Sequence, residues 1–154
     1  MSDPVEKQLF DAAYEGRAFE VSSLLRDHPA INVNLTNHEH WTSLHIASFN
    51  GHVEVVKLLL AHPNINVNKR DNNGQTPLSV GCENGHVGVV QELLKDPRVD
   101  VTLADLNGRT PLWWASCAGR HEIIEGFIAS GRDLGDIKNK KGKNWRDGQI
   151  LHSP

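Results

Sequence analysis

The sequence predicts an all-α solenoid in which short helix-turn-helix pairs stack along one axis and are linked by hairpin loops. Three observations predict it: a repeat of 34 residues, apolar side chains at helical spacing, and turn-forming residues between the helical segments. A single pair of such short helices buries too little apolar surface to offset the entropy lost on ordering it. Stability is therefore expected to come from contacts between neighbouring pairs.

The repeat is visible as columns of equivalent residues. The segments Thr42-Ser43-Leu44-His45, Thr76-Pro77-Leu78-Ser79 and Thr110-Pro111-Leu112-Trp113 begin 34 residues apart. Further columns with the same interval are Gly51, Gly85 and Gly119; Val56, Val90 and Ile124; Leu59, Leu93 and Phe127; and Leu60, Leu94 and Ile128. So many independent columns with one interval exclude chance.

An earlier repeat carries one extra residue. The segment Leu9–Gly16 copies Leu44–Gly51 at an interval of 35, whereas His28–Asn34 copies His62–Asn68 at 34. The extra residue therefore lies in the loop after the first glycine. We expect one domain over residues 1–154, with repeats at about 4–36, 37–70, 71–104 and 105–138 and a partial fifth repeat or cap at 139–154.

Each repeat contains signals for two helices. Thr76 and Thr110 can cap a first helix, and the proline after each suits a first turn that needs no amide hydrogen. The glycine column then allows the left-handed backbone that ends a helix. In Val53–Leu60, apolar residues at i, i+3 and i+4 form the stripe of a second helix. Asp71–Gly74 and Asp105–Gly108 supply the turns between repeats.

Composition excludes several classes of function. The formal net charge of -3 is unlike the basic surplus of a nucleic-acid or membrane-surface binder. No apolar run approaches the roughly 20 residues of a membrane-spanning helix, and the polar N-terminus is unlike a secretory signal. Cys82 and Cys117 are too few for a disulfide framework, which favours a reducing compartment. We expect the cytoplasm, with the nucleus as an alternative.

The sequence contains no P-loop, dinucleotide-binding, nucleophile-elbow or C-x-x-C motif, so we expect no enzyme activity and no cofactor. The segment His121–Glu125 differs from a zinc-protease motif because glutamate replaces the second histidine. His38 and His40 are a close pair that the repeat does not explain. Two ligands fall short of a four-ligand site, so we expect no metal, with binding by this pair as the alternative.

These segments resemble the ankyrin repeat, with its T-P-L-H-x-A helix start, G-H turn and V-V-x-x-L-L second helix, over roughly residues 4–145. The resemblance implies antiparallel helix pairs, outward-pointing hairpin loops, and a concave groove formed by the loop tips and first helices. It also implies a non-enzymatic interaction module or scaffold whose partner is another protein, not a small molecule, a nucleic acid or a membrane. The identity of that partner stays open. We expect a monomer unless the C-terminal end of the stack is uncovered.

Some residues depart from the family pattern. The family's histidine is kept only as His45, because Ser79 and Trp113 replace it, so its hydrogen bonds are in question in two repeats. Gly81 stands at an alanine position and is expected to loosen its helix by about 0.5–1 kcal/mol. His40 stands where two other hairpins have glycine, and it is strained if the turn requires a positive φ.

The family's groove positions supply the candidate contact residues. They are His38, Glu39, Trp41, Phe49, Asn50, Asn72, Asn73, Gln75, Glu83, Asn84, Leu106, Asn107, Arg109, Trp113 and Cys117, with Ala118 beside them. The leading anchors are Trp41, Phe49, Trp113 and Arg109, because aromatic and arginine residues carry most of the binding energy at interfaces. Alanine at Trp41 and Phe49 is expected to weaken binding and to leave the melting temperature nearly unchanged. Packing of Trp41 on the neighbouring hairpin is the alternative.

The burial expected of the two adjacent tryptophans, Trp113 and Trp114, follows from their positions in the repeat. Trp114 is equivalent to Ile46 and Val80 and is expected in the core. Trp113 occupies the family's histidine position, and core and groove edge are equally good interpretations.

The C-terminal segment leaves several hypotheses open. A basic cluster consists of Lys138, Lys140, Lys141, Lys143 and Arg146. It is either a solvated loop or a surface for the acidic part of a partner. Residues 139–154 supply no second helix, so they fold back as a lid, or the chain is a recognition fragment of a larger multidomain protein such as an enzyme, channel or effector. A designed scaffold without a natural ligand is the remaining alternative.

Overall fold

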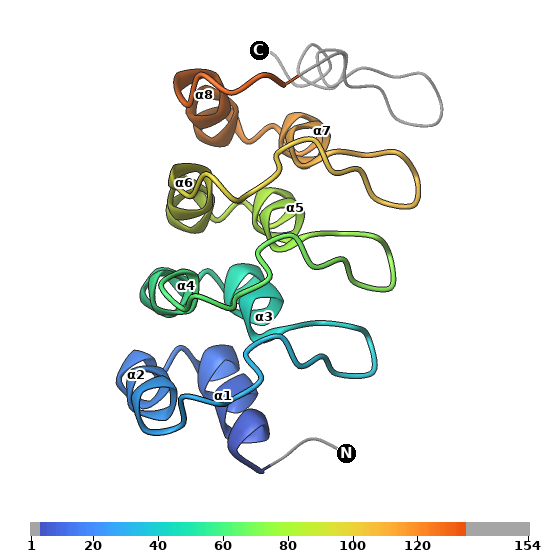
Figure 1. Ribbon diagram of the computed structural model, residues 1–154. Helices are drawn as coiled ribbons and strands as arrows, with labels where there is room; N and C mark the ends of the chain where they lie inside the picture. The colour runs from blue at the N-terminus through green and yellow to red at the C-terminus, as the bar shows by residue number, and fades with distance from the viewer. Residues whose placement is uncertain (1–3, 135–154) are drawn as a thin grey trace.

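The computed structural model describes residues 4–134, which form eight helices and no strand (Figure 1). The helices are α1 (Pro4–Glu15), α2 (Ala18–Asp27), α3 (Ser43–Asn50), α4 (Val53–Leu60), α5 (Pro77–Glu83), α6 (Val87–Lys95), α7 (Pro111–Cys117) and α8 (His121–Ala129). The predicted all-α solenoid of helix-turn-helix pairs is confirmed. The proposed cap at 139–154 and the basic cluster lie outside the described residues.

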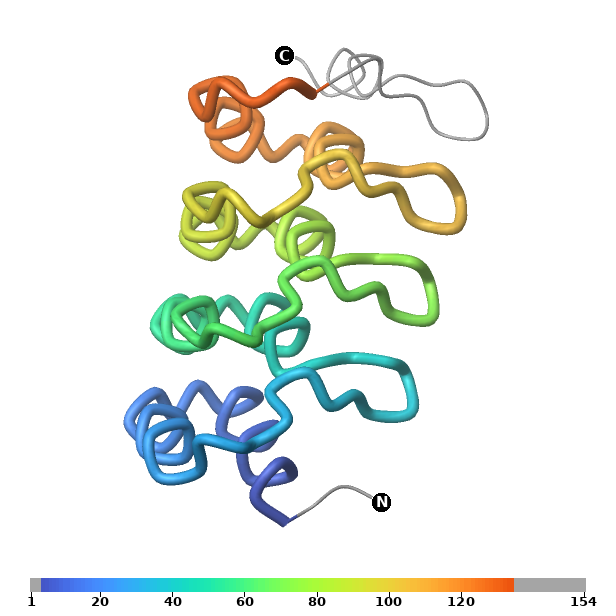
Figure 2. The backbone as a smooth tube through the Cα atoms, viewed as in Figure 1, coloured from blue at the N-terminus to red at the C-terminus, as the bar shows by residue number. Residues whose placement is uncertain are grey.

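The four helix pairs stack in two rows (Figure 1). The inner row consists of α1, α3, α5 and α7, each in contact with the next, and the outer row consists of α2, α4, α6 and α8 in the same order. The hairpin loops all project on the side of the inner row (Figure 1). The backbone in Figure 2 rises by one step at each repeat, so equivalent residues of successive repeats lie one above another.

Three inner helices start with the same cap. Thr42, Thr76 and Thr110 have extended backbones. Each hydroxyl accepts the N–H of the residue three positions later, with N···O distances of 3.2, 3.3 and 3.2 Å. A proline is the first helical residue of α5 and α7. The predicted helix starts are therefore confirmed, together with their mechanism.

The glycine after α3 is required for two reasons. Gly51 has φ of +74°, which is costly for residues that carry a Cβ atom. A Cβ atom built there would also lie 2.6 Å from Nδ1 of His86 in the next repeat. The His86 ring occupies this space because its Nε2 donates to the carbonyl of Phe49 at 2.7 Å. This glycine thus ends one helix and admits the side chain that links it to the next repeat.

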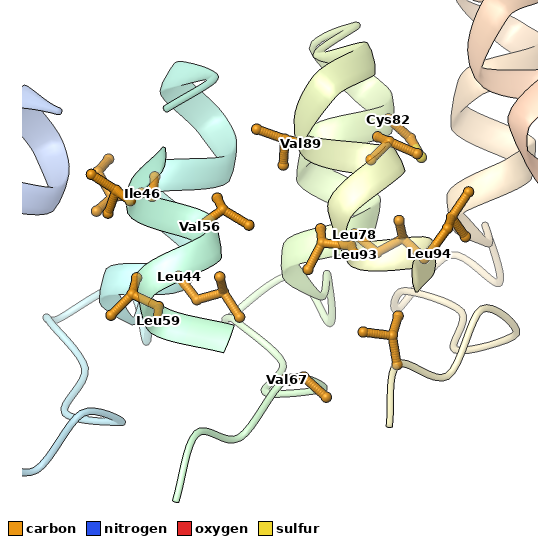
Figure 3. Packing of buried hydrophobic residues seen from close by; sticks show 14 of the residues in the cluster. Leu44, Ile46, Val56, Leu59, Val67, Leu78, Cys82, Val89, Leu93 and Leu94 are labelled. Atoms are coloured by element: carbon orange, nitrogen blue, oxygen red, sulfur yellow. The ribbon is translucent and has the colours of Figure 1, made fainter. Parts of the chain in front are cut away.

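The apolar columns form one continuous core between the two rows (Figure 3). Val56, Val90 and Ile124 have exposed fractions of 0%, 1% and 2%. They lie on α4, α6 and α8, and each of these outer helices contacts its neighbour in the row. The prediction that they point into the stack is confirmed.

The buried histidine position behaves differently in each repeat. His45 is fully buried; its Nδ1 accepts the Thr42 N–H at 3.2 Å and its Nε2 donates to the Gln75 carbonyl at 3.0 Å. Ser79 is too short for this bridge, and its buried hydroxyl has no hydrogen-bond partner among the described residues. Trp113 fills the position with an apolar ring. The bridge to the next repeat is therefore present once, as the departures from the family pattern suggested.

Candidate binding groove

Two columns of equivalent residues face the hairpin loops, and together we call them the groove face. The inner-helix column contains Tyr14, Phe49, Glu83 and Cys117, and the hairpin column contains Trp41, Gln75 and Arg109. The two columns touch: the rings of Trp41 and Phe49 are 5.2 Å apart, and Gln75 donates to Glu83 at 2.9 Å. The groove face therefore changes along the stack from aromatic to acidic to basic.

One side-chain oxygen fixes the backbone of each hairpin. Oδ1 of Asn37, Asp71 and Asp105 accepts the N–H groups two and four residues later, at 2.8–2.9 Å. The second of these N–H groups belongs to the hairpin column. Adjacent hairpins are also joined, because the N–H of Leu106 donates to the carbonyl of Asn73 at 3.0 Å. The hairpin column is consequently preorganised before any partner binds.

The aromatic part of the groove face is both packed and exposed. Trp41 is half-buried, its Nε1 donates to Oδ2 of Asp71 at 2.9 Å, and its ring stacks on His45 at 6.1 Å. Phe49 beside it is 41% exposed. Trp41 thus packs on the neighbouring hairpin, as the alternative interpretation held, and one edge of it remains at the surface. The expectation that alanine at Trp41 leaves the melting temperature unchanged is not compatible with these contacts.

The basic part of the groove face is an arginine stacked on two indoles. The Cζ atom of Arg109 lies 4.6 Å from the ring centre of Trp113 and 5.1 Å from that of Trp114. Trp114 donates its Nε1–H to Oδ2 of Asp105 at 3.0 Å. The Nε atom of Arg109 is buried and has no hydrogen-bond partner in residues 4–134. Ring faces hold the charge of this arginine, and no carboxylate pairs with it in the described structure.

The prediction that Trp114 lies in the core is wrong. Trp114 is half-buried at the groove face, whereas its equivalents Ile46 and Val80 are buried. An indole is larger than an isoleucine or valine side chain, and its N–H needs an acceptor, which Asp105 offers only at the groove. Trp113, the proposed anchor, is only 8% exposed and belongs to the core cluster.

A hollow of about 370 Å³ lies between the third and fourth repeats on this face. Its lining consists of Asn73, Gln75, Glu83, Asp105, Leu106, Asn107, Arg109 and Trp114. Six of these eight are candidate contact residues from the sequence; Asp105 and Trp114 are additions. The structure therefore brings the C-terminal candidates together around one depression.

The candidate residues differ widely in exposure. His38, Glu39, Phe49, Asn72, Asn73, Leu106 and Asn107 are exposed; Trp41, Asn50, Glu83, Asn84, Arg109 and Cys117 are half-buried; Gln75 and Trp113 are buried. The two buried residues offer a partner little surface. Gln75 is buried because its Nε2 is held by Glu83.

Tyr14 was missed as a candidate. It is 54% exposed and equivalent to Phe49, and its carbonyl accepts the Nε2–H of His52 at 2.9 Å. The signal was present in the interval of 35 that relates the first two repeats. Applying that interval to the groove positions would have found it.

Within residues 4–134, no group of three metal-ligating side chains occurs, and none of the helices is long and apolar enough to cross a bilayer. Stacked helix pairs, projecting hairpins and a groove face define a helical-repeat protein. The family model for ankyrin repeats (three copies) matches residues 9–105 and 66–138. The chain therefore belongs to the ankyrin-repeat family, whose members are generally protein-interaction modules and typically not enzymes. A search of curated proteins finds no match to the chain.

Proposed function

We propose that the chain is a non-enzymatic adaptor that binds a partner protein through the groove face. The supporting observation is the distribution of exposed apolar side chains. Within residues 4–134, the large apolar side chains that are exposed are Tyr14, Phe19, Phe49, Leu106 and Ile128. Tyr14 and Phe49 lie on the groove face, and Leu106 lines the hollow beside Arg109, so these three exposed side chains come from three different repeats.

The preorganised surroundings of these side chains also support this function. A partner that binds a rigid surface avoids the entropy cost of ordering it, so more of the contact energy appears as affinity. Phe49 lies against the fixed ring of Trp41, and Leu106 is on a hairpin joined to its neighbour. Aromatic and arginine anchors surrounded by polar groups are the usual composition of a binding hot spot.

We propose the cytoplasm as the compartment. The two cysteines stand at non-equivalent positions of adjacent repeats, so the chain is built without a disulfide framework.

A matched pair of phenylalanine substitutions tests the binding function. Phe49 lies on the groove face and Phe19, which is 85% exposed, lies on the outer helix α2. The immobilised chain is used to capture proteins from a lysate of cells that express it, and each captured protein is quantified. We expect Phe49→Ala and Leu106→Ser to reduce capture of the same protein, and Phe19→Ala to leave it unchanged. Loss of capture with Phe19→Ala alone would place the binding surface on the outer row and refute the proposal.

A further inference from the structure

We propose that the aromatic part of the groove face binds a basic side chain, arginine or lysine, from a protein partner. The cationic head would lie over the rings of Phe49 and Trp41. This inference rests on the proposed function and names the chemistry of the partner at one place on the surface.

The fourth repeat shows how this groove face uses an aromatic pair. There Arg109 lies over Trp113 and Trp114 at 4.6 and 5.1 Å. In the second repeat, Trp41 stands at the position equivalent to Arg109, and Phe49 provides an aromatic ring in the inner-helix column. No cation lies over these rings within residues 4–134. The faces of aromatic rings carry negative partial charge, so the exposed Phe49 ring attracts a cation more than an anion.

Two carboxylates flank the aromatic part. Glu39 is exposed at the hairpin tip two residues before Trp41, and Glu83 follows Phe49 in the inner-helix column, on the helix that contacts α3. Neither carboxylate forms an ion pair with any described residue. Oε2 of Glu83 is held by Gln75, which orients the group.

The other charged or titratable groups nearby form no ion pair with these carboxylates among the described residues. His38 and His40 lie beside Glu39 on the same hairpin and form no ion pair with it. Arg109 lines the same hollow as Glu83, but its guanidinium lies over two indoles and forms no ion pair with that carboxylate.

Other occupants fit these charges less well. An acidic side chain would be repelled by both carboxylates and by the ring faces. A purely apolar side chain would cover the aromatic surface but would remove water from Glu83 without pairing it, which costs free energy. A basic side chain satisfies both requirements, because its aliphatic stem packs on the rings and its head reaches the carboxylates.

A display library of random peptides provides the test without knowledge of the natural partner. Peptides are selected on the immobilised wild-type chain, and those that fail to bind Phe49→Ala are sequenced. We expect arginine and lysine to be enriched at one position of these groove-dependent peptides. Enrichment of acidic residues, or of apolar residues alone, would overturn the inference.

Matched variants then test the contact in one selected peptide. Phe49→Leu keeps an apolar side chain and removes the ring face, so we expect about 2- to 30-fold weaker binding, the range for cation–π contacts. A peptide with norleucine in place of the basic residue should lose this difference. Glu39→Gln should lower the affinity for the basic peptide more than the affinity for the norleucine peptide. Phe19→Leu should change neither affinity. If Phe49→Leu loses its native circular dichroism spectrum, the inference is tested with Glu39→Gln, whose substituted side chain is exposed. Equal binding of the basic peptide to this variant and to the wild type would then refute the inference.

The outcomes separate this inference from the function on which it rests. If the groove-dependent peptides share no basic position, the inference that this site binds a basic side chain is refuted. The proposed function, binding of a partner protein through the groove face, would still stand. A selection that yields no groove-dependent peptide would count against both.

Discussion

At the scale of single residues, Asp71 performs two tasks at the groove face. Its Oδ1 accepts two backbone N–H groups of its own hairpin, and its Oδ2 accepts the indole N–H of Trp41 from the preceding repeat. Asp105 repeats the arrangement with Trp114 of its own repeat. Each carboxylate therefore shapes a hairpin and orients a tryptophan beside the groove.

Trp41→Ala is expected to lower the free energy of unfolding by about 1–3 kcal/mol, because it removes packing and leaves Oδ2 of the buried Asp71 without its donor. Urea denaturation followed by circular dichroism measures this change. Phe49→Ala is the comparison and should cost less, about 0.5–1.5 kcal/mol, since Phe49 is 41% exposed and loses one ring contact without leaving a buried polar atom unpaired. Equal effects of the two variants would contradict the assigned contacts.

His45 makes the stability depend on pH. Burial lowers the pKa of His45 below its ordinary value, so the folded state binds a proton less readily than the unfolded state. The contribution of this residue is thus complete above about pH 6.5, the unfolded pKa, and is lost as the pH falls below it. Urea midpoints measured at decreasing pH should fall more steeply for the wild type than for His45→Ser. Parallel profiles of the two proteins would rule out this role.

At the scale of helices, the glycines of the repeat fall into two groups. Gly51 has a positive φ and lies against His86, whereas Gly81 is inside α5 in the helical conformation. A Cβ atom at Gly81 would lie 3.4 Å from side-chain carbons of Val89 and Val90, which is ordinary contact. Only the first of these positions needs glycine.

Gly81→Ala is expected to raise the free energy of unfolding by about 0.5–1 kcal/mol, because alanine loses less backbone entropy in a helix. Gly51→Ala should instead be destabilising, because it combines backbone strain with a clash. Thermal denaturation of the two variants compares them directly. A lower melting temperature for Gly81→Ala would mean that the contact with Val89 and Val90 is too tight.

At the scale of the whole molecule, stability comes from contacts between neighbouring repeats. Each inner helix contacts the next inner helix, and each outer helix contacts the next outer helix. Polar bridges follow the same direction: Asn34 pairs through its side chain with the backbone of Asn64 and Asn66, and Asn68 does the same one repeat later. A local change in the core is therefore expected to affect neighbouring repeats.

Leu93→Ala is expected to cost about 2–5 kcal/mol, since Leu93 is fully buried and the cavity cannot close completely. Tryptophan fluorescence arises from Trp41 in the second repeat, Trp113 and Trp114 in the fourth, and Trp145 near the C-terminus. It should shift to lower urea together with circular dichroism. Leu106→Ala, at a position 62% exposed, is the control and should shift neither signal much. A change confined to one signal would show that the repeats unfold separately.

Much of the fold and part of the candidate site could be predicted from the sequence. His40 is expected to be strained if its turn requires a positive φ, and the turn does require one, because φ of His40 is +59°. Caps, glycine turns and apolar columns act through neighbouring residues, and the repeat interval places them on equivalent positions. The groove positions implied by the resemblance to the ankyrin repeat include six of the residues around the hollow between the third and fourth repeats. Their roles in binding stay predictions.

The sequence by itself determined the register of the stack: where each repeat starts, which columns are apolar, and which face carries the hairpins. Only the tertiary structure decided which of two adjacent tryptophans reaches the groove face, and that Trp41 and Gln75 are held by neighbouring side chains. The physical reason is that periodicity specifies the direction of a Cβ atom. The final position of a large or polar side chain depends on its volume and on hydrogen-bond partners far away in the sequence or in another repeat.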